Sequence, residues 1–243
     1  MSAVERTEAV ATRRSELSLA ERAEMRGLLE TYFEGVTETQ FARDLVEKDW
    51  VLRVFSDGRL VGFSTLAVGV ERLCDGREVN VVYSGDTIMA PEAWGSPVLA
   101  RGWIRLVRRA CAELGERPGY WLLLSSGFRT YRFLPVFWRE FWPRAGGESP
   151  EAMELRKVRD ELARRRFGVA YDAAAGVVRF GAPQRLRGEL AEVPEGRTRD
   201  AHVAFFLAAN TGHGAGDELV CLTELSDENL TAAGRRVVRE AGV

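Results

Sequence analysis

The sequence lacks the features that crosslinked, metal-binding and membrane-spanning proteins need. Its three cysteines, Cys74, Cys111 and Cys221, are far apart and odd in number, which favours reduced thiols. The two histidines, His202 and His213, stand in no short Cys or His cluster, so we expect no metal site. The chain has no run of about 18 apolar residues and no apolar stretch of the signal-peptide kind at its N-terminus. We therefore expect a cytoplasmic protein without a membrane segment.

A strong charge of either sign is also missing. The formal net charge is -2 at pH 7 and the pI is near 5.9, so the composition does not indicate the basic surface of a nucleic-acid-binding protein. Apolar residues make up 46% and charged residues 29% of the 243 residues, which is typical of a globular domain with a core of its own. We expect no nucleic-acid or membrane partner. Composition leaves the oligomeric state open.

Two amphipathic helices are expected near the N-terminus, after a polar segment, 1–16, that we expect to be flexible. Apolar residues recur at helical spacing over 17–32, and Ser18 followed by Glu21 forms a capping-box pattern at the start of this helix. The second helical stretch covers 37–47.

A β-meander follows the two helices. Between Trp50 and Met89 the residues alternate in the manner of strands, and Asp57-Gly58 and Asp75-Gly76 interrupt the alternation with turn sequences. This pattern predicts three antiparallel strands joined by tight turns.

A loop, a helix and a buried strand then complete a βαβ unit. The segment 90–97 contains prolines and a glycine that end the meander, and 98–114 has a strong apolar helical face. The run YWLLLSS at 120–126 is short and nearly all apolar, as in a strand that is buried on both faces. We expect the crossover between the two strands to be right-handed.

The remainder of the chain is less regular. Residues 129–142 are rich in aromatic side chains and predict a core or lining helix, and 151–166 predict a charged helix. We expect three parts: the flexible segment 1–16, a core over 17–145, and a C-terminal extension, 146–243, that packs on the core.

The order of elements, together with MAPEAWGSPVLARGWIRLVRRACAELG from Met89 onward, resembles the GNAT superfamily of acyltransferases over Leu17–Pro143. The resemblance implies an α/β (α+β) fold with a mixed, mostly antiparallel central sheet flanked by helices. It also implies an acyl-CoA co-substrate and no metal. In that superfamily the loop before the long helix wraps the donor's pyrophosphate with backbone N–H groups at the helix N-terminus, where an anion is favoured.

This loop departs from the superfamily's usual pattern of Arg or Gln, two residues, Gly, one residue, and then Gly or Ala. The sequence has Trp94-Gly95-Ser96-Pro97 instead, and Pro97 removes one backbone donor. Two interpretations stay open: the donor is acyl-CoA held by changed contacts, or it is an acyl group on the phosphopantetheine of an acyl carrier protein. The residues that we expect to bind the donor are Ile88, Met89, Trp94, Gly95, Ser96 and Val98.

The resemblance implies direct transfer of the acyl group from a thioester to an amine, which requires proton transfer. Asp86 lies in an apolar strand, where a carboxylate without a partner is costly, so it either deprotonates the amine or forms a structural pair with Arg129 or Arg132. Tyr131 is close to the place from which the superfamily protonates the leaving thiolate. Its alternative role is that of a buried tyrosine with a hydrogen-bonded hydroxyl.

The acceptor side is the least specified. We expect it to include Ser84, Thr87, Arg129, Arg132 and His213, the last of which lies between two glycines and could titrate near neutral pH. The acceptor would be a small-molecule or peptide amine. The aromatic residues of 120–142 suit a sizeable apolar pocket for a longer acyl chain or an aromatic substrate. The alternative function is a catalytically silent, GNAT-like binding or structural module.

Overall fold

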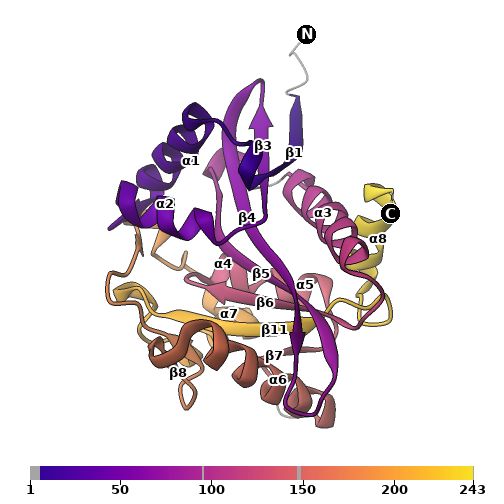
Figure 1. Ribbon diagram of the computed structural model, residues 1–243. Helices are drawn as coiled ribbons and strands as arrows, with labels where there is room; N and C mark the ends of the chain where they lie inside the picture. Colours follow the sequence, from indigo (N-terminus) through magenta and orange to yellow (C-terminus); the bar gives the residue numbers. More distant parts are fainter. Residues whose placement is uncertain (1–5, 95, 147–148, 243) are drawn as a thin grey trace.

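The computed structural model describes residues 6–94, 96–146 and 149–242, and a single mixed β-sheet lies at its centre (Figure 1). Among the described strands, only β5 and β6 pair in parallel; the other pairs of this sheet are antiparallel. The fold class expected from the sequence is therefore confirmed. In spatial order the strands are β1 (Thr7–Arg13), β3 (Trp50–Ser56), β4 (Arg59–Arg72), β5 (Glu78–Met89), β6 (Gly119–Ser125), β11 (Glu218–Glu224), β9 (Val177–Val178) and β8 (Tyr171–Asp172), with β7 (Phe141–Trp142) pairing with β11 beside this path.

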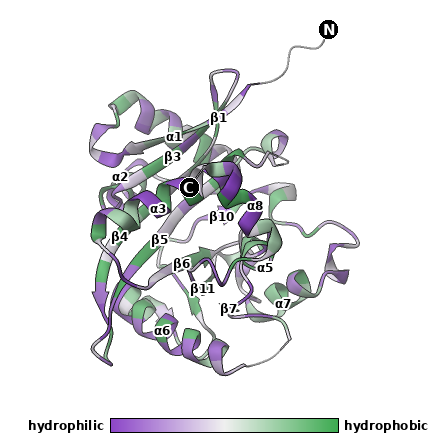
Figure 2. Ribbon diagram, turned by 90° about the vertical axis from the view of Figure 1, so that its right-hand side faces the viewer, coloured by the Kyte–Doolittle hydropathy of each residue, from purple (hydrophilic) through white to green (hydrophobic). Residues whose placement is uncertain are grey.

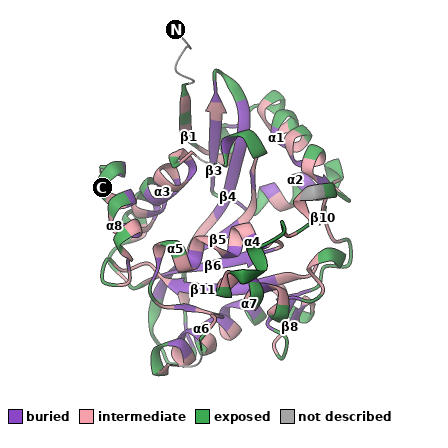
Figure 3. Cartoon of the chain, turned by 180° about the vertical axis from the view of Figure 1, so that it is seen from behind, coloured by how far each residue is buried: buried purple, intermediate pink, exposed green. Residues whose placement is uncertain are grey.

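Helices cover both faces of this sheet (Figures 1 and 3). One face carries α1 (Leu19–Tyr32), α2 (Glu38–Val46) and α6 (Pro150–Phe167). The other face carries α3 (Val98–Leu114), α4 (Phe128–Tyr131), α5 (Phe133–Phe137), α7 (Ala201–Ala209) and α8 (Ala232–Ala241). A separate two-stranded sheet joins β2 (Phe33–Glu34) to β10 (Arg185–Leu186). In the described part of the chain, no helix is both long and apolar enough to cross a membrane.

The hydrophobic core is divided by the sheet. Strand side chains alternate between the faces, so Val82 of β5 packs with the α3 side while Val81 and Tyr83 pack with the α6 side. Further along the same strand, Ile88 belongs to the cluster under α1 and α2. Figure 2 shows hydrophobic residues concentrated on the central strands and mixed colouring along the surrounding helices. Two separate clusters on one face therefore meet between Tyr83 and Ile88.

The local signals in the first half of the chain act as the sequence predicts. Ser18 and Glu21 form the reciprocal hydrogen bonds of a capping box at the start of α1, and the Thr37 side chain caps α2. The three strands of the meander are β3, β4 and β5, and the glycines of its turns, Gly58 and Gly76, have φ angles of 80° and 90°. These left-handed conformations favour glycine at both positions.

Two strands occupy places in the sheet that the sequence does not predict. Thr7–Arg13 lies in the segment that we expect to be flexible, yet it forms β1 and pairs with β3 over its whole length. The C-terminal part is expected to pack on the core, with strand or helix at 218–222, and the structure goes further: Glu218–Glu224 forms β11 and pairs with β6 inside the sheet. Both strands are stabilised by partners far away in sequence, which local periodicity does not reveal.

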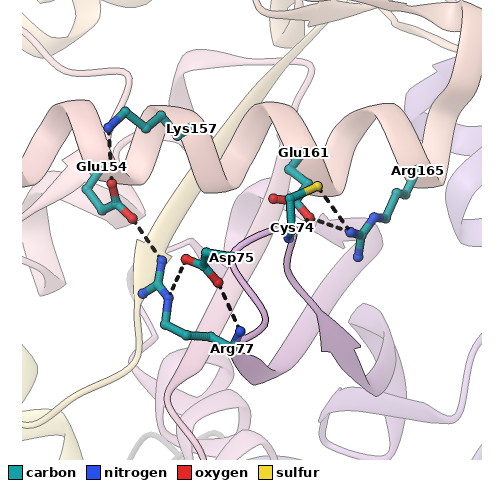
Figure 4. Close-up of polar contacts among 7 residues, drawn as sticks. All are labelled: Cys74, Asp75, Arg77, Glu154, Lys157, Glu161 and Arg165. Atoms are coloured by element: carbon teal, nitrogen blue, oxygen red, sulfur yellow. Dashed lines mark hydrogen bonds and ion pairs between the residues drawn. The ribbon is translucent and has the colours of Figure 1, made fainter.

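Ion pairs fix α6 on the turn between β4 and β5 (Figure 4). Arg77 in this turn region donates to Asp75 at 2.7 Å and to Glu154 of α6 at 2.8 Å. Near the other end of the helix, Arg165 Nη2 lies 3.8 Å from Cys74 Sγ. Both parts of α6 are thereby held against the turn between β4 and β5.

Gly102 allows α3 to lie directly on β1 and β3. A Cβ at this position would lie 2.8 Å from Ala9 Cβ and 3.1 Å from Leu52 Cδ1. We expect Gly102→Ala to lower the free energy of unfolding by about 1 kcal/mol, because overpacking outweighs the gain in helix propensity. The matched control is Gly27→Ala in α1, where nothing lies within 4 Å and a gain of about 0.5–1 kcal/mol is expected. Urea unfolding measures both, and an equal gain in the two variants would contradict this packing.

Candidate functional site

The two parallel strands of the sheet separate before β5 ends. β5 pairs with β6 from Asn80, opposite Gly119, to Ser84, opposite Leu123. From there to Met89, β5 keeps only its partner β4. The carboxyl ends of both strands lead toward helices, α3 and α4, and ligands of open α/β sheets bind in crevices of this kind.

A β-bulge lies where the strands separate. Ser64 of β4 pairs with Thr87 and Leu66 pairs with Ser84, so Thr65 alone stands opposite Gly85 and Asp86. A bulge leaves part of the ladder unpaired and turns a side chain away from its regular direction. Here it aims Asp86 at the face that carries α2 and α6, because the groups whose charges act on this carboxyl are Lys48 and Asp44.

On the opposite face, an apolar cavity of about 40 Å³ lies beside the same separation. Its polar wall consists of hydroxyls that already hydrogen-bond with protein. Ser84 Oγ accepts from Trp121 Nε1 at 2.7 Å, and Ser64 Oγ lies 2.8 Å from Thr87 Oγ1. The other lining residues are Leu99, Ala100, Trp103, Ile104, Leu123, Thr130, Phe133, Phe137, Trp138, Leu230, Gly234 and Val237.

Three tryptophans line this cavity and pack against one another. The ring centroids of Trp103 and Trp121 are 4.3 Å apart, and those of Trp121 and Trp138 are 5.0 Å apart. Each of these residues is buried. The aromatic segment that the sequence singles out is thus partly core and partly the wall of a small cavity.

The face with α2 and α6 carries a polar cluster at the bulge. Lys48, next to the C-terminal end of α2, is only 5% exposed and donates from Nζ to the Asp44 carbonyl oxygen at 2.8 Å. Thr65 is 1% exposed, and its hydroxyl has no hydrogen-bond partner among the described residues. Asp86 and Glu218 complete the cluster, and both residues keep part of their surface exposed. The cluster lies where the two core clusters of this face meet.

The pKa values of the two carboxyl groups, Asp86 and Glu218, lie above their ordinary values. Burial raises the pKa of Asp86 to about 6, against an opposing effect of the Lys48 ammonium. Burial raises the pKa of Glu218 to about 8, and the charges of Asp86 and Asp44 raise it further. Burial lowers the pKa of Lys48, although the Asp86 charge offsets part of that effect. At neutral pH this arrangement gives one charged carboxylate beside one protonated carboxyl.

A charged groove of about 360 Å³ lies next to this cluster. Tyr83 connects the groove to the polar cluster, because its side chain lines the groove and its ring centroid lies 5.3 Å from Lys48 Nζ. The Arg166 guanidinium lies 3.7 Å from the same ring centroid and 3.7 Å from a Glu47 oxygen. The other lining residues are Asp49, Ala67, Val68, Gly69, Glu71, Val81, Leu122, Leu162 and Arg165.

The loop before α3 uses several of its own amide groups. The sequence predicts amides here that are free to bind an anion, but the Ala93, Trp94 and Ser96 N–H groups donate to carbonyls within the loop at 2.9, 3.3 and 3.1 Å. The Val98 N–H donates to the Ser96 hydroxyl at 3.3 Å. The prediction is therefore wrong for these four amides. The first turn of α3, which has no side-chain cap and whose Leu99 and Ala100 line the cavity, keeps N–H groups without helical partners.

The structure gives Asp86 a different partner from those that the sequence suggests. Arg132 pairs with Asp200 at 3.1 Å. Arg129 donates to the Leu190 carbonyl oxygen at 3.1 Å and stacks on the Trp94 ring at 4.3 Å. A structural pair of Asp86 with either arginine is thus wrong, because the cation whose charge acts on Asp86 is Lys48.

The other expected residues divide between the cavity and the core. Ser84 and Thr87 line the cavity, as do Leu99 and Ala100, which follow the donor loop in the sequence. Tyr131 is fully buried against Phe141 and Phe206, and its hydroxyl donates to the Pro143 carbonyl oxygen at 2.9 Å. This contact corresponds to the second role that the sequence leaves open for Tyr131, that of a hydrogen-bonded core residue.

The expected donor residues are also spread out. The Ile88 side chain packs under α1 and α2, away from the cavity, while Met89 packs on the α3 side and its carbonyl oxygen accepts from Trp94 Nε1 at 2.8 Å. Gly95 lies outside the described residues. His213 packs edge-on against an aromatic ring of α7, and its Nδ1 lies 2.9 Å from the Asn210 carbonyl oxygen.

Three members of the polar cluster are not found by the sequence reasoning. Lys48 follows the C-terminal end of α2, Thr65 lies in an apolar strand, and Glu218 begins a strand far along the chain. The scarcity of lysine in an arginine-rich sequence is a signal for Lys48. Nothing local marks Glu218, because it reaches the cluster only through the pairing of β11 with β6.

Within the described residues, no group of three or more His, Cys, Asp or Glu side chains is arranged to hold a metal ion. The polar cluster thus consists of two carboxyls, an ammonium and a hydroxyl.

No protein-family model and no curated protein matches the chain, but solved structures do. A probable N-acyltransferase of unknown function from Enterococcus faecalis is 12% identical over 91% of this chain and 67% of its own, with a TM-score of 0.41. A GNAT family N-acetyltransferase from Escherichia coli in complex with CoA is 19% identical over 50% and 64%, with a TM-score of 0.37. An acyl-CoA N-acyltransferase from Pseudomonas aeruginosa is 17% identical over 48% and 79%, with a TM-score of 0.33. One of the three is named as a GNAT family member, and at these identities and TM-scores the matches carry no conclusion about activity.

Glu218 should make the stability of the protein depend on pH. Its folded-state pKa lies above the ordinary value, so its contribution to stability is full below about pH 4.5 and is lost as pH rises toward about 8. We expect Glu218→Gln to become more stable than the wild type over this window. The difference should grow by an amount on the order of 2 kcal/mol, reduced by the residue's partial exposure.

Urea unfolding at several pH values between 4.5 and 8 measures this difference. The matched control, Glu228→Gln, removes an exposed carboxylate and reports the effect of losing one charge on its own. A constant difference between Glu218→Gln and the wild type across the window would contradict the raised pKa.

Proposed function

We propose that this protein is an acyltransferase that transfers an acyl group from a thioester donor to an amine, with Asp86 as the base. The observation that carries the proposal is the coincidence of three features at one point of the sheet. The parallel strands β5 and β6 separate after Ser84, a bulge follows at once, and a carboxyl group with a pKa of about 6 stands on that bulge. A base should have a pKa near the working pH, and this carboxyl meets that condition.

The proposed reaction forms a bond between the amine nitrogen and the thioester carbonyl carbon. Asp86 accepts a proton from the amine, so that the nitrogen can attack with its electron pair. The carbon–sulfur bond then breaks, and the thiolate leaves and takes up a proton. A bulge leaves backbone donors of the strand outside the ladder, and such N–H groups can stabilise the negative charge that develops on the carbonyl oxygen.

The two faces of the sheet suit the two substrates. We propose that the acyl end of the donor enters the apolar cavity beside Ser84 and Thr87, while the amine approaches from the face with Lys48 and Asp86. An ammonium is attracted to a carboxylate, and a thioester chain is better solvated by an apolar wall. The substrates would then meet through the separation of the strands.

The donor is proposed to be acyl-CoA, and an acyl group on a carrier-bound phosphopantetheine remains the alternative. The uncommitted N–H groups in the first turn of α3 favour an anionic group there. The exposed Trp94 ring and Arg129, stacked at 4.3 Å, stand beside that turn and offer an aromatic and a cationic contact. Comparison of acyl-CoA with acyl-pantetheine, which lacks the nucleotide, separates the two donors.

A catalytically silent binding module is the second candidate. The observation in its favour is the small cavity volume, about 40 Å³, combined with a donor loop whose amides are largely used within the loop. Such a protein would bind a thioester or a thiol without turnover.

Asp86→Asn should remove most of the activity. With acetyl-CoA as the donor and lysine, cadaverine and phenethylamine as test amines, we expect the variant to lower kcat/KM by about 10²–10⁴, because the base is lost. Product formation is followed by mass spectrometry of the acylated amine. The matched control is Asp75→Asn, which changes an exposed carboxylate at the other end of the hairpin that contains β5.

The wild-type kcat/KM should also rise between pH 5 and 7 as Asp86 loses its proton. Full activity in Asp86→Asn would exclude Asp86 as the base. Binding of CoA without turnover of any test amine would favour the silent module.

Phe137 should limit the length of the acyl chain. Its side chain lines the cavity, whose volume of about 40 Å³ suits a short acyl group. We expect Phe137→Ala to raise kcat/KM for hexanoyl-CoA relative to acetyl-CoA by about tenfold or more, since each buried methylene contributes on the order of 1 kcal/mol. Val136→Ala, on the exposed side of the same helix, is the control. A wild-type preference for hexanoyl-CoA would show that the cavity opens to longer chains without the substitution.

A further inference from the structure

Lysine is rare in this protein, and one of its two lysines is buried at the candidate site. The chain has 34 lysines and arginines together, of which only Lys48 and Lys157 are lysines. The Lys157 side chain is 74% exposed on α6, whereas Lys48 is 5% exposed. An ammonium is a compact charge whose protonation responds to burial, and a guanidinium is planar and always charged. Position 48 thus uses the cation that fits a narrow space.

The absence of a side chain at Gly85 leaves room for the Lys48 side chain to cross the bulge. A Cβ on Gly85 would lie 2.5 Å from Lys48 Cε and 3.1 Å from Nζ, so the lysine side chain passes directly over that glycine. The ammonium is anchored at its end, where Nζ donates to the Asp44 carbonyl oxygen at 2.8 Å. The position of the Lys48 charge relative to β5 is therefore fixed by packing.

Charged and titratable groups from every neighbouring element face Lys48. Helix α2 contributes Asp44 and Glu47, β5 contributes Asp86 and the face of the Tyr83 ring, and α6 contributes Arg166. Glu218 of β11 joins the set through its interaction with Asp86 and Asp44. Lys48 is a cation within a set of carboxyl groups, and the Arg166 guanidinium lies 3.7 Å from the centroid of the Tyr83 ring.

The charge of Lys48 affects the pKa of Asp86, but it is not among the effects on the pKa of Glu218. The Lys48 charge acts directly on Asp86, while the effects on Glu218 come from burial and from the negative charges of Asp86 and Asp44. When two titratable groups have environments that differ in this way, their acid and base roles separate. Burial raises the pKa of both carboxyls, and the Lys48 ammonium opposes this effect at Asp86.

We propose that Lys48 is the positioning residue of the site: its ammonium, fixed across Gly85, stabilises a negative charge on the neighbouring Asp86 more than one on Glu218. Asp86 is then the member of the pair that accepts the proton of the amine. This inference rests on the proposed function for the role of Asp86 in transfer. The distribution of charge between the two carboxyls does not depend on that function.

The test is a carboxyl titration by ¹³C NMR on the full chain labelled at aspartate and glutamate side chains. Lys48→Gln can keep the hydrogen bond to the Asp44 carbonyl oxygen while losing the charge, and Lys48→Met loses both. In each variant we expect the titration midpoint of Asp86 to rise by about one pH unit or more, because an attractive charge has been removed. Lys157→Gln is the matched control and should leave both midpoints unchanged. Asp86→Asn should lower the midpoint of Glu218 and so identifies the two signals.

A rate measurement separates this inference from the proposed function. In Lys48→Gln, the pH profile of kcat/KM should shift upward by the same amount as the Asp86 midpoint, a change that simple loss of packing does not produce. An unchanged Asp86 midpoint in both folded Lys48 variants overturns the inference, even if the enzyme is active. Shifted midpoints in a protein without transferase activity would uphold the role of Lys48 and overturn the proposed function instead. If one Lys48 variant does not fold, as judged by thermal unfolding, the other decides.

Discussion

The candidate site depends on β5 keeping its hydrogen bonds to β4 after it has lost those to β6. One partner holds the strand in place, and the loss of the other lets β5 and β6 separate in the middle of the sheet, a separation that we call the opening. The bulge opposite Thr65 lies at this transition and turns Asp86 toward the face with Lys48. A regular ladder would give Asp86 the opposite direction, since strand side chains alternate. The chemistry proposed here therefore depends on a local irregularity within otherwise regular pairing.

The surrounding layers give the two sides of this opening different properties. On the α3 side the core reaches the opening and forms a small apolar cavity. On the other side the core is divided between α1 with α2 and α6, and polar groups occupy the gap between the two clusters. Burial in this gap explains the raised pKa values of Asp86 and Glu218. The proposed thioester and amine would therefore meet surroundings of different polarity on opposite faces of one sheet.

Much of the fold could be predicted where the signal is local. The capping residues Ser18 and Thr37, the turns of the meander, and the apolar face of α3 all determine structure within a few residues of themselves. The places of β1 and β11 in the sheet could not be predicted in this way. Their stability comes from pairing with β3 and β6, which lie about 40 and 100 residues away, as the register of each pair shows.

The site could be predicted only in part for the same reason. Asp86 is conspicuous as a carboxyl in an apolar strand, and Ser84 and Thr87 accompany it. Lys48 and Glu218 are brought to Asp86 by tertiary structure, so no spacing in the sequence relates the three. The arginine pair suggested for Asp86 was wrong because Arg132 binds Asp200 and Arg129 stacks on Trp94. Tyr131 has the aromatic surroundings that the sequence implies, with its hydroxyl bound to the Pro143 carbonyl oxygen.

The central claim is that a thioester donor lies in the opening between β5 and β6. Backbone amide NMR of the full chain during titration with CoA and acetyl-CoA tests it most directly. The account predicts the largest shift changes at Gly85, Asp86 and the first turn of α3, with small changes on α6 and in the charged groove. Changes confined to the groove, or no changes at millimolar ligand, would contradict it.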